Sequence, residues 1–241
     1  MQKMQPTFID VMRHGEPEGV CPEGGTILRG RTDHALTDKG WLQAYQRAEQ
    51  LLNDGNEWDV IISSPLIRCA HFAKALITEK LMSHPDCLID ARWREIDYGD
   101  WDGLSTAKIW QDSPELMEKM WQNPMGFCAP KGEAVTDFSM RIEQAWSDLL
   151  MQHQGKRILL VCHGGVMRLL LKQLLLLAPE AMNRFAIPYA AVSRFRIDHS
   201  TSEEGPALTW PSLVTHLGDA ISVGKIDTEE QMQKNGNMNN E

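Results

Sequence analysis

Two histidines, each at the end of a hydrophobic run, constrain the fold of this chain more than any other feature. His14 follows an apolar run over 8–12 and Arg13, and His163 follows a second run over 157–162 and precedes two glycines. Because open α/β sheets bind ligands at the carboxyl edge of their parallel strands, both histidines are expected at one such edge. Imidazole beside guanidinium is the pairing that phosphoryl transfer to a histidine needs, so the pattern predicts a phosphate site.

Strand and helix signals alternate along the chain, which predicts a three-layer αβα sandwich around a mostly parallel sheet. Strands are predicted over 7–12, 59–62 and 157–162, with two late strands near 191–197 and 207–216 at the other edge of the sheet. Helices are predicted from Thr37 to Leu52, from Ser64 to Leu81, over 135–153 and from 165 to about 177.

The chain length suits a single α/β domain, which we place at 1–227. Residues 88–134 are less regular and rich in tryptophan and proline, and this stretch is interpreted as a cap inserted over the site, partly helical around 104–122. From residue 228 onward the chain is polar and poor in aromatic residues, which is typical of a disordered tail.

Charge and cysteine content restrict the partners of the chain. A formal net charge of -9 at pH 7 disfavours nucleic acid and anionic membranes, so an anion must bind in a local arginine-rich pocket. The five cysteines form no C-x-x-C pair, which indicates reduced thiols and a cytoplasmic protein. The longest apolar stretch is interrupted by polar residues and falls short of the roughly 20 residues that span a bilayer.

Two further segments supply candidate site residues. Arg68 is expected in the first turn of the helix after the second strand, from where its guanidinium can reach an anion at the sheet edge; the alternative is a solvated helix arginine. Glu95 lies between Trp93 and Ile96 in a carboxylate-rich segment over 92–103. Partial desolvation there would raise its pKa and suit it to acid–base chemistry.

Five ordered motifs resemble those of the histidine phosphatase (phosphoglycerate mutase-like) superfamily. They are Arg-His-Gly at 13–15, Gly-Arg-Thr-Asp at 30–33, Ser-Ser-Pro with Arg68 at 63–68, Glu95 with Tyr-Gly-Asp-Trp at 98–101, and His-Gly at 163–164. The resemblance covers about residues 7–200. Within the superfamily, the segments at 63–73, 92–103 and 163–168 look most like the α-ribazole-5′-phosphate phosphatases of cobalamin biosynthesis.

This resemblance implies a phosphomonoester hydrolase that needs no metal and acts on a small-molecule substrate. It makes His14 the nucleophile that accepts the phosphoryl group, and Glu95 the proton donor. Arg13, Arg68 and a protonated His163 would bind the phosphate and neutralise its charge.

Three more positions are assigned to the phosphate site. Gly164 begins a helix whose backbone N–H groups can approach an oxyanion closely. Gly30 lies where the family's second phosphate-contacting loop falls, and Arg31 beside it is either a residue of the site rim or a solvated loop charge. The chain departs from the family at 16–20, where no asparagine follows Arg-His-Gly, and at 131–134, where Lys-Gly-Glu-Ala replaces Gly-Gly-Glu-Ser.

Two other functions are weighed against hydrolysis. Phosphoglycerate mutases of this kind usually carry Glu-Arg-His-Tyr-Gly at the acid segment, whereas Glu95 is followed by Ile-Asp-Tyr-Gly and the cap has few basic residues. A non-catalytic binding or regulatory module would be signalled by loss of the nucleophile or the acid, and His14 and Glu95 are both present.

Two questions concern the remaining histidines and the cap. The other histidines show no ligand spacing joined to carboxylates, so no metal site or other cofactor is predicted. The cap tryptophans either stack on a flat substrate ring, such as a benzimidazole nucleoside, or fill the core of the cap; they are residues 93, 101, 110 and 121.

Overall fold

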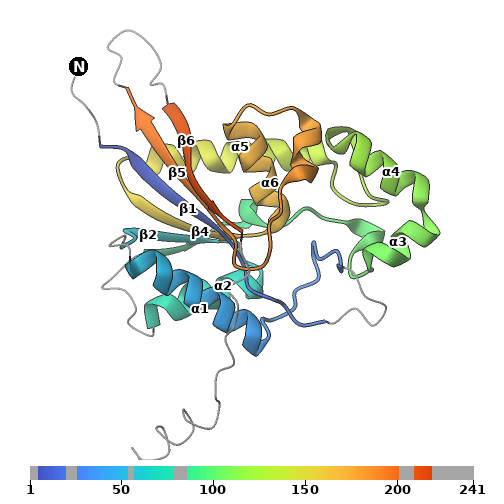
Figure 1. Ribbon diagram of the computed structural model, residues 1–241, viewed down its shortest axis with the longest axis horizontal. Helices are drawn as coiled ribbons and strands as arrows, with labels where there is room; N and C mark the ends of the chain where they lie inside the picture. Colours follow the sequence, from blue (N-terminus) through green and yellow to red (C-terminus); the bar gives the residue numbers. More distant parts are fainter. Residues whose placement is uncertain (1–4, 20–25, 54–56, 79–85, 201–208, 219–241) are drawn as a thin grey trace, which may run out of the picture.

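A six-stranded sheet with helices on both faces forms the body of the protein in a computed structural model (Figure 1), which confirms the predicted α/β sandwich. The structure describes residues 5–19, 26–53, 57–78, 86–200 and 209–218. The strands are β1 (Thr7–Arg13), β2 (Val60–Ser63), β3 (Asp86–Ile89), β4 (Arg157–Cys162), β5 (Val192–His199) and β6 (Thr209–Leu217).

The sheet order is β3-β2-β4-β1-β5-β6, and the first four of these strands run parallel. The two late strands are antiparallel and form one edge, as predicted. Because β1 and β4 are neighbours in the register Arg13 opposite Cys162, the residues that follow them, His14 and His163, are also neighbours. The His14 N–H donates to the carbonyl of Cys162 at 3.1 Å and continues the pairing beyond the strands.

Helices cover both faces of this sheet (Figure 1). One face carries α1 (Asp38–Asn53) and α2 (Ile67–Thr78), and the other carries α5 (Val135–Gln152) and α6 (Gly164–Leu174). Strand β4 alternates between the two cores: Leu159 and Val161 pack on the α1 and α2 side, and Ile158 and Leu160 on the α5 and α6 side. A strand buried on both faces needs such an unbroken apolar run, and that run made β4 predictable.

The cap follows the sheet's outermost parallel strand. Strand β3 lies at the edge and includes the first two residues of the predicted insert; its short, half-exposed sequence carries no strand signal. The cap then consists of α3 (Thr106–Asp112), α4 (Pro114–Gln122) and the short 3-10 helices η1 (Ala91–Trp93), η2 (Gly99–Trp101) and η3 (Pro124–Gly126). The predicted helical stretch is divided at Ser113, because the following proline begins a new helix.

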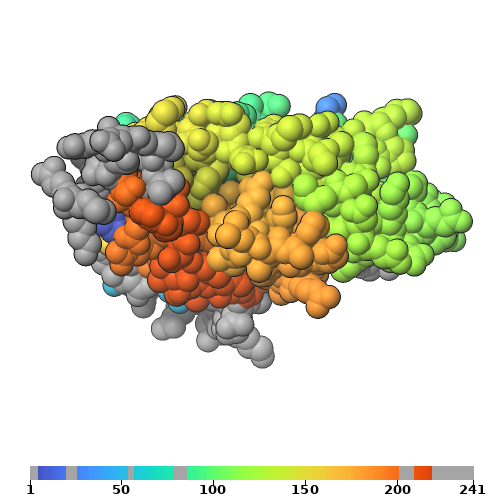
Figure 2. All heavy atoms as spheres, turned by 90° about the horizontal axis from the view of Figure 1, so that it is seen from above, coloured from blue at the N-terminus to red at the C-terminus, as the bar shows by residue number. Residues whose placement is uncertain are grey.

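The cap packs against η4 (Pro179–Arg184), the 3-10 helix that follows α6. Figure 2 shows these two segments, green and orange, as one continuous surface, and the Asn183 amide joins them by donating to the carbonyls of Met120 and Trp121 at 3.4 and 3.3 Å. Among the described residues, no helix is long and apolar enough to cross a membrane. The predicted tail from 228 and the predicted end of the helix at Leu81 lie outside these residues.

Candidate active site

His14 is the centre of the site and lies directly after β1. Its Nδ1 is 2.7 Å from the carbonyl oxygen of Gly15, so Nδ1 carries the proton and donates, which leaves the Nε2 lone pair free. The ring is buried, and burial, followed by the charges of Arg68 and Arg13, lowers the pKa of His14 well below its ordinary value of 6.5. The imidazole is therefore neutral near pH 7, which is the form that a nucleophile needs.

Close backbone packing holds the loop that carries His14 against the start of α1. A Cβ on Gly15 would lie 1.9 Å from the carbonyl oxygen of Gly40, and a Cβ on Gly40 would lie 2.1 Å from the carbonyl oxygen of Glu16. Only hydrogen fits at both positions. The predicted cap residue of α1 is confirmed, since the Gly40 N–H donates to the Thr37 hydroxyl at 3.0 Å.

Two guanidinium groups lie beside His14, that of Arg68 fully buried and that of Arg13 partly buried, and the Nε atom of each is buried. Arg68 is fully buried and donates to the carbonyls of Thr32 and Arg29 at 2.8 and 2.9 Å. Arg13 donates to the carbonyl of Ile187. Among the described residues, the Nε atoms of both arginines are buried with no hydrogen-bond partner. Because buried polar groups are nearly always paired, these two nitrogens are available to donate to an anion.

His163 is fully buried, with its ring centroid 5.3 Å from that of His14. Its Nε2 lies 2.8 Å from the Ser64 hydroxyl. Burial, and then the charge of Arg68, lowers the pKa of His163 well below 6.5, so the imidazole is neutral in the anion-free protein. The sequence-based expectation of a protonated His163 is therefore wrong for the anion-free protein. A protonated ring beside Arg68 requires the charge of a bound phosphate.

Glu95 reaches the site from the irregular loop between η1 and η2. One carboxylate oxygen accepts from the N–H of Gly165 at 2.9 Å, and the other accepts from the N–H of Ile96 at 3.0 Å. A Cβ on Gly165 would lie 2.2 Å from this carboxylate. The second glycine after His163 thus makes room for an acid from another segment.

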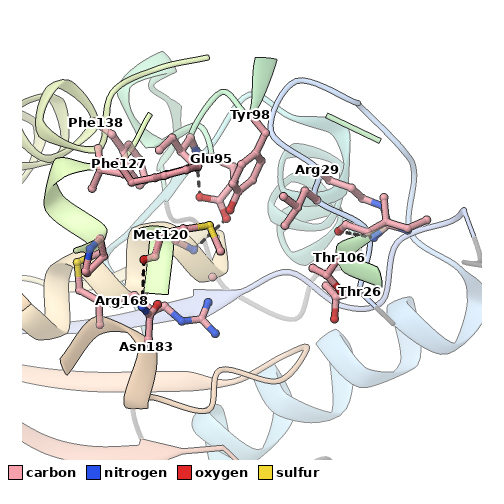
Figure 3. A pocket seen from close by; sticks show the side chains of 18 of the residues that line it. Thr26, Arg29, Glu95, Tyr98, Thr106, Met120, Phe127, Phe138, Arg168 and Asn183 are labelled. Atoms are coloured by element: carbon pink, nitrogen blue, oxygen red, sulfur yellow. Dashed lines mark hydrogen bonds between the residues drawn. The ribbon is translucent and has the colours of Figure 1, made fainter. Parts of the chain in front are cut away.

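A cavity of about 310 Å³ opens over these groups (Figure 3). We use the name floor for its polar end together with two residues beside it: Arg13, His14, Glu95, Gly164 and Gly165 line the cavity, and Arg68 and His163 lie next to His14 outside the lining. We call its apolar side the cap wall; it comprises Met120, Trp121, Phe127, Phe138 and Met182. Figure 3 shows Phe127 and Phe138 across the cavity from Thr26, Arg29 and Thr106, with Glu95 and Tyr98 between the two sides.

The structure places the two loop candidates outside this cavity lining. The Arg31 side chain is 80% exposed and forms an ion pair with Asp97 at 2.6 Å, which matches the solvated alternative. Gly30 is buried, and a Cβ there would lie 2.2 Å from the carbonyl oxygen of Ile96. It packs the loop of Arg29 against the segment of Glu95.

Among the lining residues that were not predicted as site residues, three lie close to the floor. Tyr189 lies under the Arg13 guanidinium, 4.3 Å from the ring centroid, and its ring is 5.8 Å from that of His14. It lies in an irregular segment with no motif, so the sequence held no signal for it. Arg168 follows Gly164 by one helical turn, and this spacing could have indicated it. Tyr98 is buried beside Glu95, and both effects raise its pKa, so its hydroxyl stays protonated.

The cap tryptophans differ in burial and in their position relative to the cavity. Trp93 and Trp101 are buried and fill the core, whereas Trp121 is 50% exposed and lines the cavity, and Trp110 is 44% exposed outside the lining. Among the described residues, no group of three histidine, cysteine, aspartate or glutamate side chains is placed to hold a metal ion.

Comparison with known proteins agrees with this geometry. The family described as "Histidine phosphatase superfamily (branch 1)" matches residues 9–204. The 2,3-bisphosphoglycerate-dependent phosphoglycerate mutase of Rhizobium etli is 28% identical over 195 residues, which is 78% of this chain and 89% of that protein. A solved structure named mycobacterial hydrolase 2 gives a TM-score of 0.76 at 22% identity, over 97% of this chain and 98% of that one. An Escherichia coli K-12 protein provisionally described as an alpha-ribazole-5'-P phosphatase gives 0.69 at 25% identity, over 89% and 97%.

Proposed function

The chain belongs to the histidine phosphatase superfamily and is a phosphatase, and from that premise we propose that it hydrolyses a phosphomonoester through a phosphohistidine on His14. The observation that carries this proposal is the floor itself. A neutral buried imidazole, fixed through Nδ1, lies beside two buried guanidinium nitrogens, those of Arg13 and Arg68, that lack a partner among the described residues.

The reaction has two balanced steps. In the first, the His14 Nε2 lone pair attacks phosphorus, the phosphorus–oxygen bond to the alcohol breaks, and the Glu95 carboxyl gives its proton to that oxygen. In the second, water attacks the phosphohistidine while the Glu95 carboxylate takes the water proton, and the phosphorus–nitrogen bond breaks to release phosphate. Arg13 and Arg68 stabilise the charge on the equatorial oxygens in both steps.

For the organic half of the substrate, we propose a flat, weakly polar group, with α-ribazole 5′-phosphate as the first candidate. The apolar cap wall supports this choice, because Trp121 and Phe127 present aromatic surface to the cavity. The likeness to the Escherichia coli protein supports it too. Mutase activity on phosphoglycerates is the competing proposal. It is favoured by the names of the curated relatives and by Arg29 and Arg168, which also line the cavity, and it is disfavoured by the apolar cap wall.

The decisive experiment follows phosphate release from p-nitrophenyl phosphate in the presence of a chelator. Hydrolysis is expected, with a loss of at least about 10⁴-fold in His14→Ala. Acid quenching should trap an acid-labile phosphoryl group on His14. Activity that survives the substitution, or that depends on an added divalent metal, would rule out the phosphohistidine route.

A substrate panel then tests the finer proposal. α-Ribazole phosphate, sugar phosphates and phosphoglycerates would be compared by kcat/KM, and the phosphoglycerates would also be assayed for isomerisation. A preference for α-ribazole phosphate supports the cobalamin role. Isomerisation of phosphoglycerate faster than phosphate release would favour the mutase.

A further inference from the structure

The proton donor of this site lies on a segment without regular structure. Glu95 belongs to the loop between η1 and η2, and within the described part of the chain its carboxylate accepts hydrogen bonds only from Gly165 and Ile96. Proton transfer needs a heavy-atom separation within hydrogen-bond reach, and misplacement by about 1 Å can cost about 10²-fold in rate. Something must therefore hold this loop in place.

Arg141 of α5 contacts the loop immediately before Glu95. One guanidinium nitrogen donates to the carbonyl of Arg92 and, at 3.1 Å, to the carbonyl of Arg94. The two other nitrogens form a bidentate pair with Glu133, at 2.9 and 2.7 Å. This fork geometry fixes the direction of the donors as well as their distance.

Glu133 contacts the same loop immediately after Glu95. Its carboxylate accepts from the N–H of Asp97 at 3.3 Å, and its own N–H donates to the carbonyl of Asp97 at 2.9 Å. The loop is thus hydrogen-bonded to this one ion pair on both sides of Glu95, at Arg94 and at Asp97. The pair is largely shielded from water, with side chains that are 24% and 20% exposed.

Neither member of this pair lines the cavity. Arg141 lies behind the cap wall, with its guanidinium 4.9 Å from the ring centroid of Phe138, and its backbone contacts are with the loop of Glu95. After burial and the charges of Arg68, His14 and Arg13, its charge also lowers the pKa of His163, an effect that acts on every substrate alike. We infer that Arg141, anchored by Glu133, is the positioning residue that holds Glu95 at proton-transfer distance from the leaving oxygen. This inference rests on the proposed acid role of Glu95.

A leaving-group comparison separates this role from a general structural one. Glu95 matters most when the leaving oxygen needs a proton, so Arg141→Met should lower kcat/KM for an alkyl phosphate by about 10²-fold. For p-nitrophenyl phosphate, whose leaving group needs little protonation, the loss should stay under about threefold. The quantity kcat/KM reports steps only up to formation of the phosphoenzyme, so the later attack of water does not blur the comparison.

A second ion pair between the same helix and the same loop provides the matched control. Asp148 of α5 pairs with Arg92, whose side chain also pairs with Asp90, upstream of the residues that flank Glu95. Asp148→Asn should lower kcat/KM for both substrates by the same small factor, under about threefold. Equal losses for the two substrates in Arg141→Met, or a leaving-group effect in Asp148→Asn as large as that in Arg141→Met, would overturn the inference.

A double-mutant cycle completes the test. If Arg141 acts through Glu95, then Arg141→Met should cost less than about twofold on the Glu95→Gln background. Full additivity would overturn the positioning role. If Arg141→Met fails to fold, the cycle is repeated with Glu133→Gln or Arg141→Lys, because these variants retain more of the hydrogen bonds to the loop of Glu95. If Glu95→Gln itself shows no leaving-group effect while His14→Ala is inactive, the proposed acid role fails and not the positioning of its loop.

Discussion

The floor and the cap wall of the cavity are built in different ways. Apart from Glu95 and Arg68, the floor groups follow strands β1 and β4 and are held by sheet register and backbone hydrogen bonds. The cap wall, apart from Phe138 of α5, comes from short helices and irregular segments, and its Trp121 is half exposed. The difference teaches that reaction type and substrate choice reside in separate structural layers. The wall can change its side chains without moving the nucleophile.

The largest expected effect tests whether the floor tolerates any added volume. Gly165→Ala places a Cβ 2.2 Å from the Glu95 carboxylate and must displace it, so kcat/KM for an alkyl phosphate should fall by about 10²- to 10³-fold. Gly164→Ala, at the neighbouring floor residue, should cost less, because its Cβ would meet no atom closer than the end of the flexible Arg168 side chain at 3.2 Å and the Arg13 Nε at 3.5 Å. Similar losses in both variants would contradict this prediction.

The next largest effect is a loss of folding stability at low pH, caused by the two buried histidines of the floor. The pKa values of His14 and His163 are lowered well below 6.5 in the folded protein. As the pH falls below 6.5, the unfolded chain binds protons that the folded floor does not, so stability decreases by up to about 1.4 kcal/mol per pH unit for each histidine. Urea unfolding between pH 7.5 and 5.5 measures the slope.

A variant with asparagine at both floor histidines is the control for that slope. His153 and His199, whose pKa values are also lowered, remain in this variant. The slope should therefore become shallower without vanishing. An unchanged slope would show that the buried floor is not its source.

A smaller effect is expected where an aromatic ring supports the floor. Tyr189→Leu removes the ring under the Arg13 guanidinium and should weaken inhibition by orthophosphate about tenfold, because a desolvated cation–π contact is worth about 1–2 kcal/mol. Tyr189→Phe retains the ring and should stay within about twofold. Equal weakening in both variants would mean that the hydroxyl, and not the ring, supports the site.

The smallest effect is expected at the cap wall. Trp121→Ala should raise KM for an aromatic phosphomonoester by about three- to tenfold and leave kcat nearly unchanged, because it removes contact area and no reacting group. Trp110→Ala, which alters a similarly exposed tryptophan outside the cavity lining, should change neither constant. A fall in kcat for Trp121→Ala would break the separation between wall and floor.

The sequence predicted the floor better than the wall for a physical reason. His14 and His163 follow buried strands whose apolar runs are unmistakable, and parallel pairing then brings them together. Arg68 and Glu95 were found through short motifs that keep their spacing. Tyr189 and the cap wall depend on how irregular segments fold back over the sheet, and no periodicity in the sequence specifies such a path. The edge strand β3 was missed because it has only four residues, and its apolar run Cys-Leu-Ile is too short to distinguish a strand from the irregular segment that follows.

The contact between Gly15 and Gly40 has a consequence for engineering and for divergence. The Gly40 backbone fills the space that a side chain at position 15 would need, and the Glu16 backbone fills the space that a side chain at position 40 would need. Neither position can be enlarged alone, and enlarging both would push α1 away from the nucleophile. Libraries aimed at new specificity should therefore leave this pair untouched and place their diversity at lining positions away from His14, beginning with Trp121, whose side chain is half exposed at the cavity.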